Sequence, residues 1–154
     1  MHNFEKILGY TFKDINNLVF AMRSPRIHIG VEGEDHKEYS KEGLATVGDS
    51  ILKSIIANDL YNSGHIYKGK ITQEKELIEK ETMHILMLKE GWINYSYNDL
   101  HFTMDNPPQH EKVVFNKHDP YVEAIVGAIF RDSNYDIVCD WTIKILIPLL
   151  RKYI

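Results

Sequence analysis

The sequence lacks the features that mark secreted and membrane proteins. Its one cysteine, Cys139, cannot form an internal disulfide, and we expect it to be a small buried thiol. The longest apolar run, residues 145–150, is interrupted by Pro148 and is far shorter than the roughly 20 residues that span a bilayer. The first residues contain no apolar segment of the kind found in signal peptides. These absences predict a cytoplasmic protein with no membrane partner.

The sequence also lacks an excess of positive charge. Its 22 acidic and 18 basic residues give a formal net charge of −4, so electrostatic attraction alone would hold a nucleic acid only weakly. The proportions of apolar and charged residues, 44% and 26%, are those of a globular chain. Neither a linker nor a repeat divides the sequence, and we expect residues 1–154 to form a single domain.

Residues 39–61 are predicted to form one long helix. Ser40 would cap its N-terminus, and apolar residues recur at intervals of three and four along it. These apolar residues are Leu44, Val47, Ile51, Leu52, Ile55 and Ile56. Gly48 interrupts the apolar stripe, although glycine costs roughly 0.5–1 kcal/mol relative to alanine inside a helix. We therefore expect a second helix to cross closely at Gly48.

Asp49, which follows this glycine, has two interpretations. A carboxylate near a helix crossing is costly to desolvate unless a cation or a hydrogen-bond donor meets it. Lys53 lies four residues further on and could form an ordinary surface ion pair with Asp49. The alternative is that Asp49 binds a metal ion together with acidic residues from elsewhere in the chain.

A second helix is predicted over residues 118–132. Asp119 would be its N-cap and Pro120 its first helical residue, and Glu123 lies four residues after Asp119 on the same face. Gly127 permits close approach of another helix, and the buried side would consist of Val122, Ile125, Val126 and Ile129. If the two glycine-bearing helices pack together, their carboxylates meet at one point.

Carboxylate oxygens from Asp49, Asp119 and Glu123 would suit Mg²⁺ or Mn²⁺ rather than zinc. Such ions activate water for attack on a phosphodiester, and a pair of them would lie roughly 3.5–4 Å apart. The two helices therefore indicate a candidate metal-dependent phosphodiesterase site.

Both segments resemble one known family, the endonuclease domain of ribonuclease III. Glu42-Gly-Leu-Ala-Thr-Val-Gly-Asp-Ser-Ile-Leu52 is similar to that family's Glu-Arg-Leu-Glu-Phe-Leu-Gly-Asp-Ala-Val-Leu. Val122-Glu-Ala-Ile-Val-Gly-Ala-Ile-Phe-Arg-Asp132 is similar to its Phe-Glu-Ala-Leu-Ile-Gly-Ala-Ile-Tyr-Leu-Asp. Shorter matches are Leu8-Gly-Tyr-Thr-Phe12, Met22-Arg-Ser24, Lys70-Ile-Thr72 and Glu81-Thr-Met83, so the resemblance covers residues 8–150.

The resemblance implies an all-α, homodimeric domain, and we expect the dimer to form through the face that carries Gly48. It also implies Mg²⁺-dependent hydrolysis of double-stranded RNA that leaves 5′-phosphate and 3′-hydroxyl ends. The metal-binding acids of the family match Asp49 and Glu123. Ala45 and Pro120 stand where the family has two further acids. The compact Mini-III branch resembles this chain in having alanine ahead of Gly-Asp and no RNA-binding domain.

Asp119 and Glu42 are the nearest replacements for the two missing acids. Asp119 would act as a third metal ligand, although an N-cap carboxylate is equally explained by bonds to its own helix. Glu42 lies seven residues before Asp49, which is about 10 Å along the helix axis. We therefore expect Glu42 to assist catalysis without binding the ion directly. It would either contact the metal ligands or face the partner subunit of the dimer.

Lys68, Lys70 and Arg23 are the candidates for contacts with RNA phosphates. In the resembling family, the loop that corresponds to Lys68 and Lys70 precedes a helix lining the RNA-binding valley. Arg23 follows a helix predicted over residues 16–22. Each of these residues also has a simpler interpretation as a solvent-exposed charge.

Further helices are predicted over residues 4–8, 82–89 and 135–153, the last kinked near Pro148, and one around residues 108–115. The helix over residues 82–89 is expected to bury Met83, Ile85, Leu86 and Leu88. The apolar residues of the helix over residues 135–153 are Ile137, Val138, Trp141, Ile143, Ile145 and Leu146. The aromatic residues expected to pack inward are Trp92, Tyr95, Tyr97 and Phe102.

Two other functions stay open. The first is a catalytically inactive module of the same fold that serves in dimerisation or RNA binding, and the replacements Ala45 and Pro120 favour it. The second is a metal phosphohydrolase built on a His-Asp pair, suggested by His118 and Asp119. Because no other histidine lies in a comparable setting, the sequence favours this second alternative less.

Overall fold

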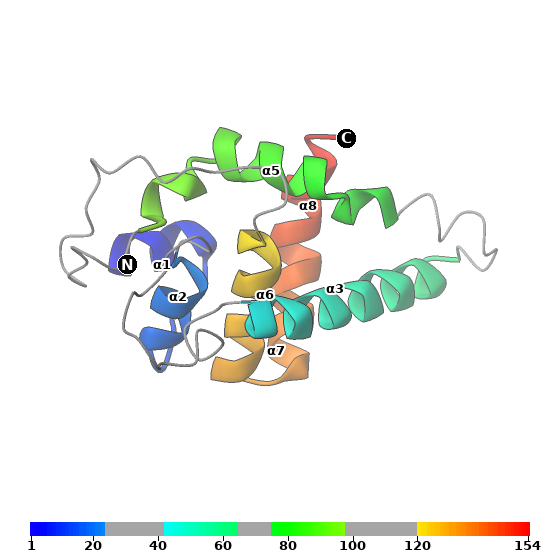
Figure 1. The fold of residues 1–154 in the computed structure, drawn as a ribbon. Coiled ribbons are helices and arrows are strands. Elements are labelled where there is room, and N and C mark those ends of the chain that lie inside the picture. Colours follow the sequence, from blue (N-terminus) through cyan, green and yellow to red (C-terminus); the bar gives the residue numbers. More distant parts are fainter. Residues whose placement is uncertain (24–41, 65–74, 98–119) are drawn as a thin grey trace.

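The computed structural model describes residues 1–23, 42–64, 75–97 and 120–154. Every regular element in these ranges is a helix, and the only β-type contact among them is an isolated bridge between Arg23 and Tyr97. The elements are α1 (His2–Leu8), α2 (Asn16–Ala21), α3 (Glu42–Asn62), η2 (Lys75–Ile78), α5 (Lys80–Lys89), η3 (Trp92–Tyr95), α6 (Tyr121–Asp132), α7 (Tyr135–Trp141), η5 (Thr142–Leu146) and α8 (Ile147–Arg151). The predicted all-α class is therefore confirmed for this part of the chain (Figure 1). None of these helices is both long and apolar enough to cross a membrane.

α6 forms the centre of the core. Every residue from Tyr121 to Ile129 is buried, as expected for a helix that is covered on all sides. α3 makes its most extensive contact with α6, and α2 also packs against α6. α1 and α2 lie together at one end of the molecule, and α5 crosses above α6 (Figure 1). Glu123 is the one acidic residue in the buried run of α6, and its backbone contacts α3 at Gly48.

The helix predicted over residues 118–132 begins later than expected. α6 starts at Tyr121, and Pro120 precedes it as the N-cap with φ −90° and ψ 53°. A ψ of this value lies outside the helical region, so the prediction that Pro120 is the first helical residue is wrong. Ser40, Asp119 and the helix expected around residues 108–115 lie outside the described residues.

The long C-terminal helix is interrupted before its proline. The amide of Ile147 donates to the carbonyl of Thr142, so η5 is a π-helical turn between α7 and α8. Pro148 has no amide hydrogen to donate, and in a regular α-helix its ring would clash with the carbonyl four residues earlier, that of Lys144, so a widened turn is expected here. The distortion near Pro148 is therefore confirmed, but it divides the predicted helix into three segments.

Leu88, which was expected on a buried face, is exposed, and so are two apolar residues of the predicted C-terminal helix. Leu88 on α5 is 50% exposed, Ile137 on α7 is 40% exposed and Ile143 on η5 is 37% exposed. The residues that α5 buries are Thr82, Met83, Leu86 and Met87. Successive residues of an α-helix are rotated by about 100° around the helix axis. Leu88 is therefore turned away from the buried face, of which Met87 is the last residue.

The predicted inward packing of the aromatic residues is confirmed where the structure describes them. Trp92 is 1% exposed and Tyr97 is 3% exposed. Tyr95 stacks on Phe4, with the ring centroids 4.7 Å apart. Phe102 lies outside the described residues. The aromatic side chains of η3 therefore anchor α1 to the core.

Asp132, the last residue of α6, joins the α1–α2 connection to the core. Its Oδ2 accepts hydrogen bonds from the Tyr10 hydroxyl (2.7 Å) and the Lys13 amide (2.8 Å). Its Oδ1 accepts from the Asp14 amide (2.9 Å) and the Asn17 side-chain amide (3.1 Å). Burial alone would raise the pKa of this carboxyl group, but the four donors together hold its pKa below the usual value. One side chain thus fixes a connection that lies more than a hundred residues earlier in the sequence.

We expect Asp132→Asn to lower the free energy of unfolding by about 2–4 kcal/mol, because an amide cannot accept hydrogen bonds from all four donors. Urea unfolding at pH 7 would measure the loss. Asp140→Asn is the matched control, since Asp140 is 61% exposed and is paired at 2.8 Å with Lys144, which is also exposed. We expect the control to change stability by less than about 0.5 kcal/mol.

The effect of Asp132→Asn should also depend on pH. A carboxyl group with a depressed folded-state pKa contributes stability above its unfolded pKa of about 3.9 and loses it as the pH falls through the folded pKa. The stability difference between wild type and variant should therefore be constant near neutrality and narrow below about pH 4. A difference that stayed unchanged down to pH 2 would contradict this role of the carboxylate.

Candidate functional site

α3 and α6 cross in direct backbone contact. A Cβ atom added to Gly48 would overlap the carbonyl oxygen of Glu123 and lie 2.8 Å from the amide nitrogen of Gly127. A Cβ atom added to Gly127 would overlap the carbonyl oxygen of Leu44 and lie 3.1 Å from its Cδ1. Only glycine fits at these two positions, so the close crossing predicted at Gly48 is confirmed.

The same contact corrects the expected dimer surface. The side of α3 that carries Gly48 is covered by α6 of the same chain. The expectation that this face forms the dimer is therefore wrong, because the glycine serves packing within the protomer. Val47 and Tyr61, at 37% and 61% exposure, are the large apolar side chains that α3 leaves exposed among its described residues.

Glu123 lies in the first turn of α6 and is 8% exposed. The positive end of the helix dipole favours a carboxylate in this turn. Because Gly48 touches the backbone of Glu123, Asp49 lies one residue from that contact, and consecutive α-carbons are about 3.8 Å apart. The crossing thus brings the α3 and α6 positions that carry Asp49 and Glu123 next to each other.

Asp49 is accessible and already has a cationic neighbour. Its Oδ2 lies 2.9 Å from the Nζ of Lys53, and the two side chains are 40% and 55% exposed. The surface ion pair considered from the sequence is therefore present. It leaves Asp49 open to solvent, so the pair and a metal-binding role are compatible. Ala45, one turn earlier on α3, is buried and contributes no charge.

The remaining candidate acids fall outside what the structure describes. Glu42 is the first residue of α3, seven positions before Asp49, and only its backbone is described. Asp119 lies outside the described ranges. Among the described residues, no group of three or more histidine, cysteine or acidic side chains could hold a metal ion. Of the four candidate acids, the structure therefore describes the side chains of two, Asp49 and Glu123.

Two carboxylates, one of them open to water, fit the way proteins hold Mg²⁺, which keeps several of its water ligands and accepts one or two carboxylate oxygens. Asp49 provides the accessible oxygen atoms, and Glu123 provides a carboxylate at a helix N-terminus. Hard oxygen donors of this kind suit Mg²⁺ or Mn²⁺. The residues present are thus compatible with the expected ion.

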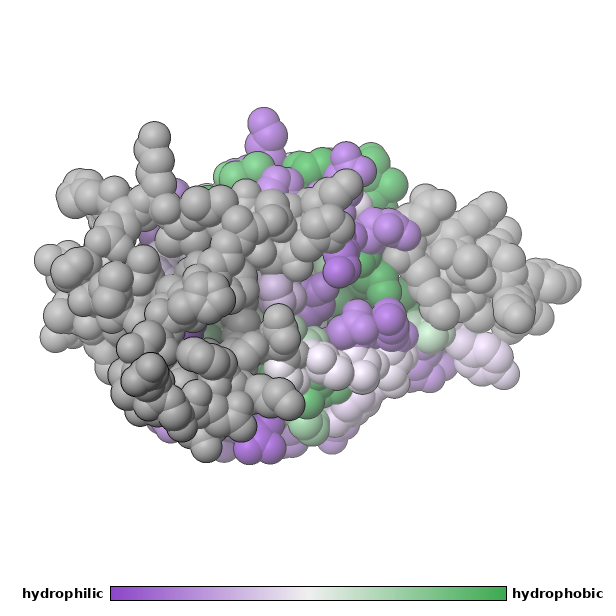
Figure 2. Space-filling model, viewed as in Figure 1, coloured by the Kyte–Doolittle hydropathy of each residue, from purple (hydrophilic) through white to green (hydrophobic). Residues whose placement is uncertain are grey.

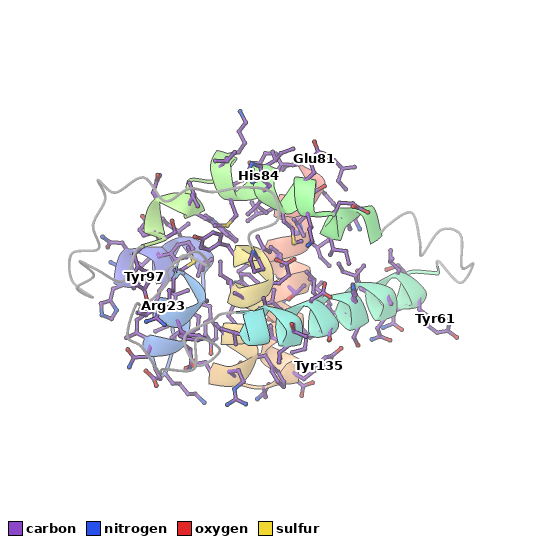
Figure 3. All side chains as sticks on the ribbon, in the orientation of Figure 1. Arg23, Tyr61, Glu81, His84, Tyr97 and Tyr135 are labelled. Atoms are coloured by element: carbon purple, nitrogen blue, oxygen red, sulfur yellow. The ribbon has the colours of Figure 1, made fainter. Side chains whose placement is uncertain are left out.

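Of the three candidate phosphate contacts, the structure describes only Arg23. It follows α2, and its guanidinium carbon lies 5.7 Å from the centroid of the Phe20 ring. Figure 3 shows Arg23 beside Tyr97 at the end of the molecule formed by α1 and α2. Lys68 and Lys70 lie outside the described residues.

The sequence predicted Leu44 only as an apolar side chain of the long helix and gave its backbone no role in the helix crossing. Its carbonyl oxygen is the atom that requires glycine at position 127. The available signal was the spacing, since Leu44 lies four residues before Gly48 on the same side of α3.

Comparison with solved structures identifies the class of domain. The chain superposes on the nuclease domain of Ribonuclease III from Campylobacter jejuni with a TM-score of 0.65 and 18% identity, over 97% of this chain and 94% of that one. A second structure of this domain gives a TM-score of 0.61 and 21% identity, over 99% and 94% of the two chains. The fold is therefore that of a ribonuclease III nuclease domain.

The sequence comparison agrees with the structural one. Ribonuclease 3 of Rickettsia typhi is 32% identical over 146 residues, which are 89% of this chain and 60% of the relative. Ribonuclease 3 of Rickettsia prowazekii gives the same figures of 32%, 89% and 60%. No family model matches the chain. The chain is thus similar in sequence to Ribonuclease 3 proteins, and it spans about 60% of the length of these relatives.

Proposed function

We propose that this chain is a metal-dependent endoribonuclease that hydrolyses double-stranded RNA in the cytoplasm during RNA processing. The observation that carries the proposal is the backbone contact between Gly48 and Glu123, one residue from Asp49, in a chain with the ribonuclease III nuclease fold. Sequence similarity to Ribonuclease 3 proteins supports RNA hydrolysis as the reaction.

The protein would supply the ligands and hold them rigidly. Asp49 and Glu123 would bind Mg²⁺ or Mn²⁺, with Asp119 as a third ligand and Glu42 as an assisting acid. When bound, such an ion would supply an activated water and would offset negative charge on the scissile phosphate. The close packing of α3 against α6 would hold the two carboxylates in a fixed relation, which limits reorganisation during the reaction. Hydrolysis would leave 5′-phosphate and 3′-hydroxyl ends.

Double-stranded RNA would be recognised mainly by its shape, phosphates and 2′-hydroxyl groups. Lys68, Lys70 and Arg23 would contact phosphates. The net charge of −4 implies that these contacts are weak without divalent ions. We expect the RNA affinity of the chain to fall steeply when Mg²⁺ is removed.

A homodimer would present two such sites to one duplex. A candidate contact surface for the dimer consists of exposed apolar side chains that do not face Gly48. They are Val47 on α3 and Tyr135 and Ile137 on α7. Apolar and polar residues alternate across the described part of the face in Figure 2. The Campylobacter jejuni domain contains a region involved in dimer formation, which supports the same arrangement here.

The decisive experiment is cleavage of a long RNA duplex by the purified chain. We expect Mg²⁺-dependent fragmentation that stops with EDTA and resumes when Mg²⁺ or Mn²⁺ is restored. Single-stranded RNA and duplex DNA of the same sequence serve as controls, and 5′-end analysis of the fragments tests the expected polarity. A chain that binds the duplex but never cuts it would instead be the inactive module favoured by Ala45 and Pro120.

A further inference from the structure

We propose that the ammonium group of Lys53 competes with the divalent ion for the carboxylate of Asp49 and thereby lowers the affinity of the site for that ion. The inference rests on the proposed function, because it assigns a role toward the metal ion to a residue that the proposal leaves unused. The Nζ atom of Lys53 lies 2.9 Å from Oδ2 of Asp49, which is the distance of a direct ion pair. A divalent ion that binds this carboxylate would therefore either lie beside the ammonium group or displace it.

Lys53 is the one charged residue within a turn of Asp49 on α3. The positions one turn before Asp49 are Ala45 and Thr46, and those one turn after it are Leu52 and Lys53. Ala45 and Leu52 are buried, so within one helical turn of Asp49, α3 offers the carboxylate a single cation and no other acid. The local charge on α3 is therefore balanced before any metal ion arrives.

The ammonium group can leave at low cost. The Lys53 side chain is 55% exposed, so its charge returns to water when the pair opens. Pairs of this exposure contribute little to stability, and a divalent ion attracts a carboxylate more strongly than an ammonium group does. Lys53 should therefore set how much divalent ion the site needs, and it should not block the site.

The chain contains a matched pair for comparison. Lys144 and Asp140 are also four residues apart, with Nζ and Oδ1 separated by 2.8 Å, and their side chains are 71% and 61% exposed. Lys144→Met changes the net charge by the same amount as Lys53→Met but alters an ion pair on α7 and η5. A difference between the two variants therefore reports on the position of the charge.

The test is titration of MnCl₂ into the wild-type chain, Lys53→Met and Lys144→Met, with free Mn²⁺ followed by electron paramagnetic resonance. Removing a positive charge about 5 Å from a divalent ion should tighten Mn²⁺ binding roughly tenfold in Lys53→Met, even with water-like screening. Lys144→Met should bind like the wild type. Asp49→Asn added to Lys53→Met should abolish the gain.

The outcomes separate the two claims. Equal Mn²⁺ affinity in wild type and Lys53→Met, or weaker binding in the variant, overturns the competition by Lys53 and leaves the nuclease proposal standing if RNA is cut. Absence of Mn²⁺ binding to all variants, together with absence of cleavage, overturns the metal site and the inference with it. Melting curves should be nearly superposable, since both lysines are exposed.

Discussion

Asp49→Asn is expected to lower the rate of Mg²⁺-dependent cleavage of double-stranded RNA by at least about a thousandfold. A bound divalent ion contributes several kcal/mol of charge stabilisation in hydrolysis, and each 1.36 kcal/mol corresponds to a factor of about ten in rate. Asparagine retains the shape of the side chain but removes the negative charge that attracts the ion. The measurement is single-turnover cleavage of a labelled duplex at saturating enzyme.

The stability of Asp49→Asn should be close to that of the wild type. The Asp49 side chain is 40% exposed and its pair with Lys53 is solvated, so the melting temperature should change little. Asp140→Asn provides the matched control, because it breaks an equivalent pair with Lys144 and should cleave at the wild-type rate. Wild-type cleavage by Asp49→Asn would show that this carboxylate does not hold the reacting ion.

The helix crossing was predictable because glycine seldom occurs inside an apolar helix without a packing reason. Gly48 lies among apolar residues that recur every three or four positions on α3, and Gly127 lies inside a continuous apolar run of α6, although alanine would favour a helix more at either position. Close approach of a second backbone compensates for this cost, and both glycines have it. The same argument could not say which atoms meet, since the carbonyl groups of Leu44 and Glu123 carry no sequence signal.

The role of Asp132 was beyond sequence reasoning. Its four hydrogen bonds come from residues 10–17, and two of them come from main-chain amides that any residue except proline would provide. The sequence around an acidic residue at the end of a helix does not show which residues will donate hydrogen bonds to it when those donors lie in a loop far away along the chain. Long-range polar contacts of this kind appear only once the helices are placed.

The exposed faces of short helices were also poorly predicted. Ile137 belongs to a seven-residue helix that is followed by a π-helical turn, so one helical period does not run through both segments. Leu88 follows the last buried residue of α5 and rotates out of the core. Apolar spacing identifies which residues can be buried, but tertiary packing decides which of them are.

Gly48→Ala should destabilise the protein more than any other single methyl group added to α3. The new Cβ atom would overlap the carbonyl oxygen of Glu123, so α3 and α6 must separate along their main contact. Overpacking of this kind costs typically 1–3 kcal/mol where side chains can adjust, and we expect about 3–5 kcal/mol here because backbone must move. For a chain of this size, that corresponds to a fall in melting temperature of about 10 °C.

Gly43→Ala is the control on the same helix. A Cβ atom at Gly43 would meet nothing within 4 Å, and alanine favours a helix over glycine. This variant should therefore be as stable as the wild type or gain up to about 1 kcal/mol. Equal melting temperatures for Gly48→Ala and Gly43→Ala would contradict the backbone contact between the two helices.

The type of atom that Gly48 meets makes this prediction sharper than an ordinary core substitution. A clash with a side chain can be relieved by trimming that side chain, but the carbonyl oxygen of Glu123 is present whatever residue occupies position 123. Glu123→Ala should therefore fail to rescue Gly48→Ala. Separating the helices also moves Asp49 away from Glu123, so any Gly48→Ala protein that remains folded should bind Mn²⁺ more weakly. Loss of stability and loss of metal binding from one added methyl group would link the packing of α3 on α6 to the proposed chemistry.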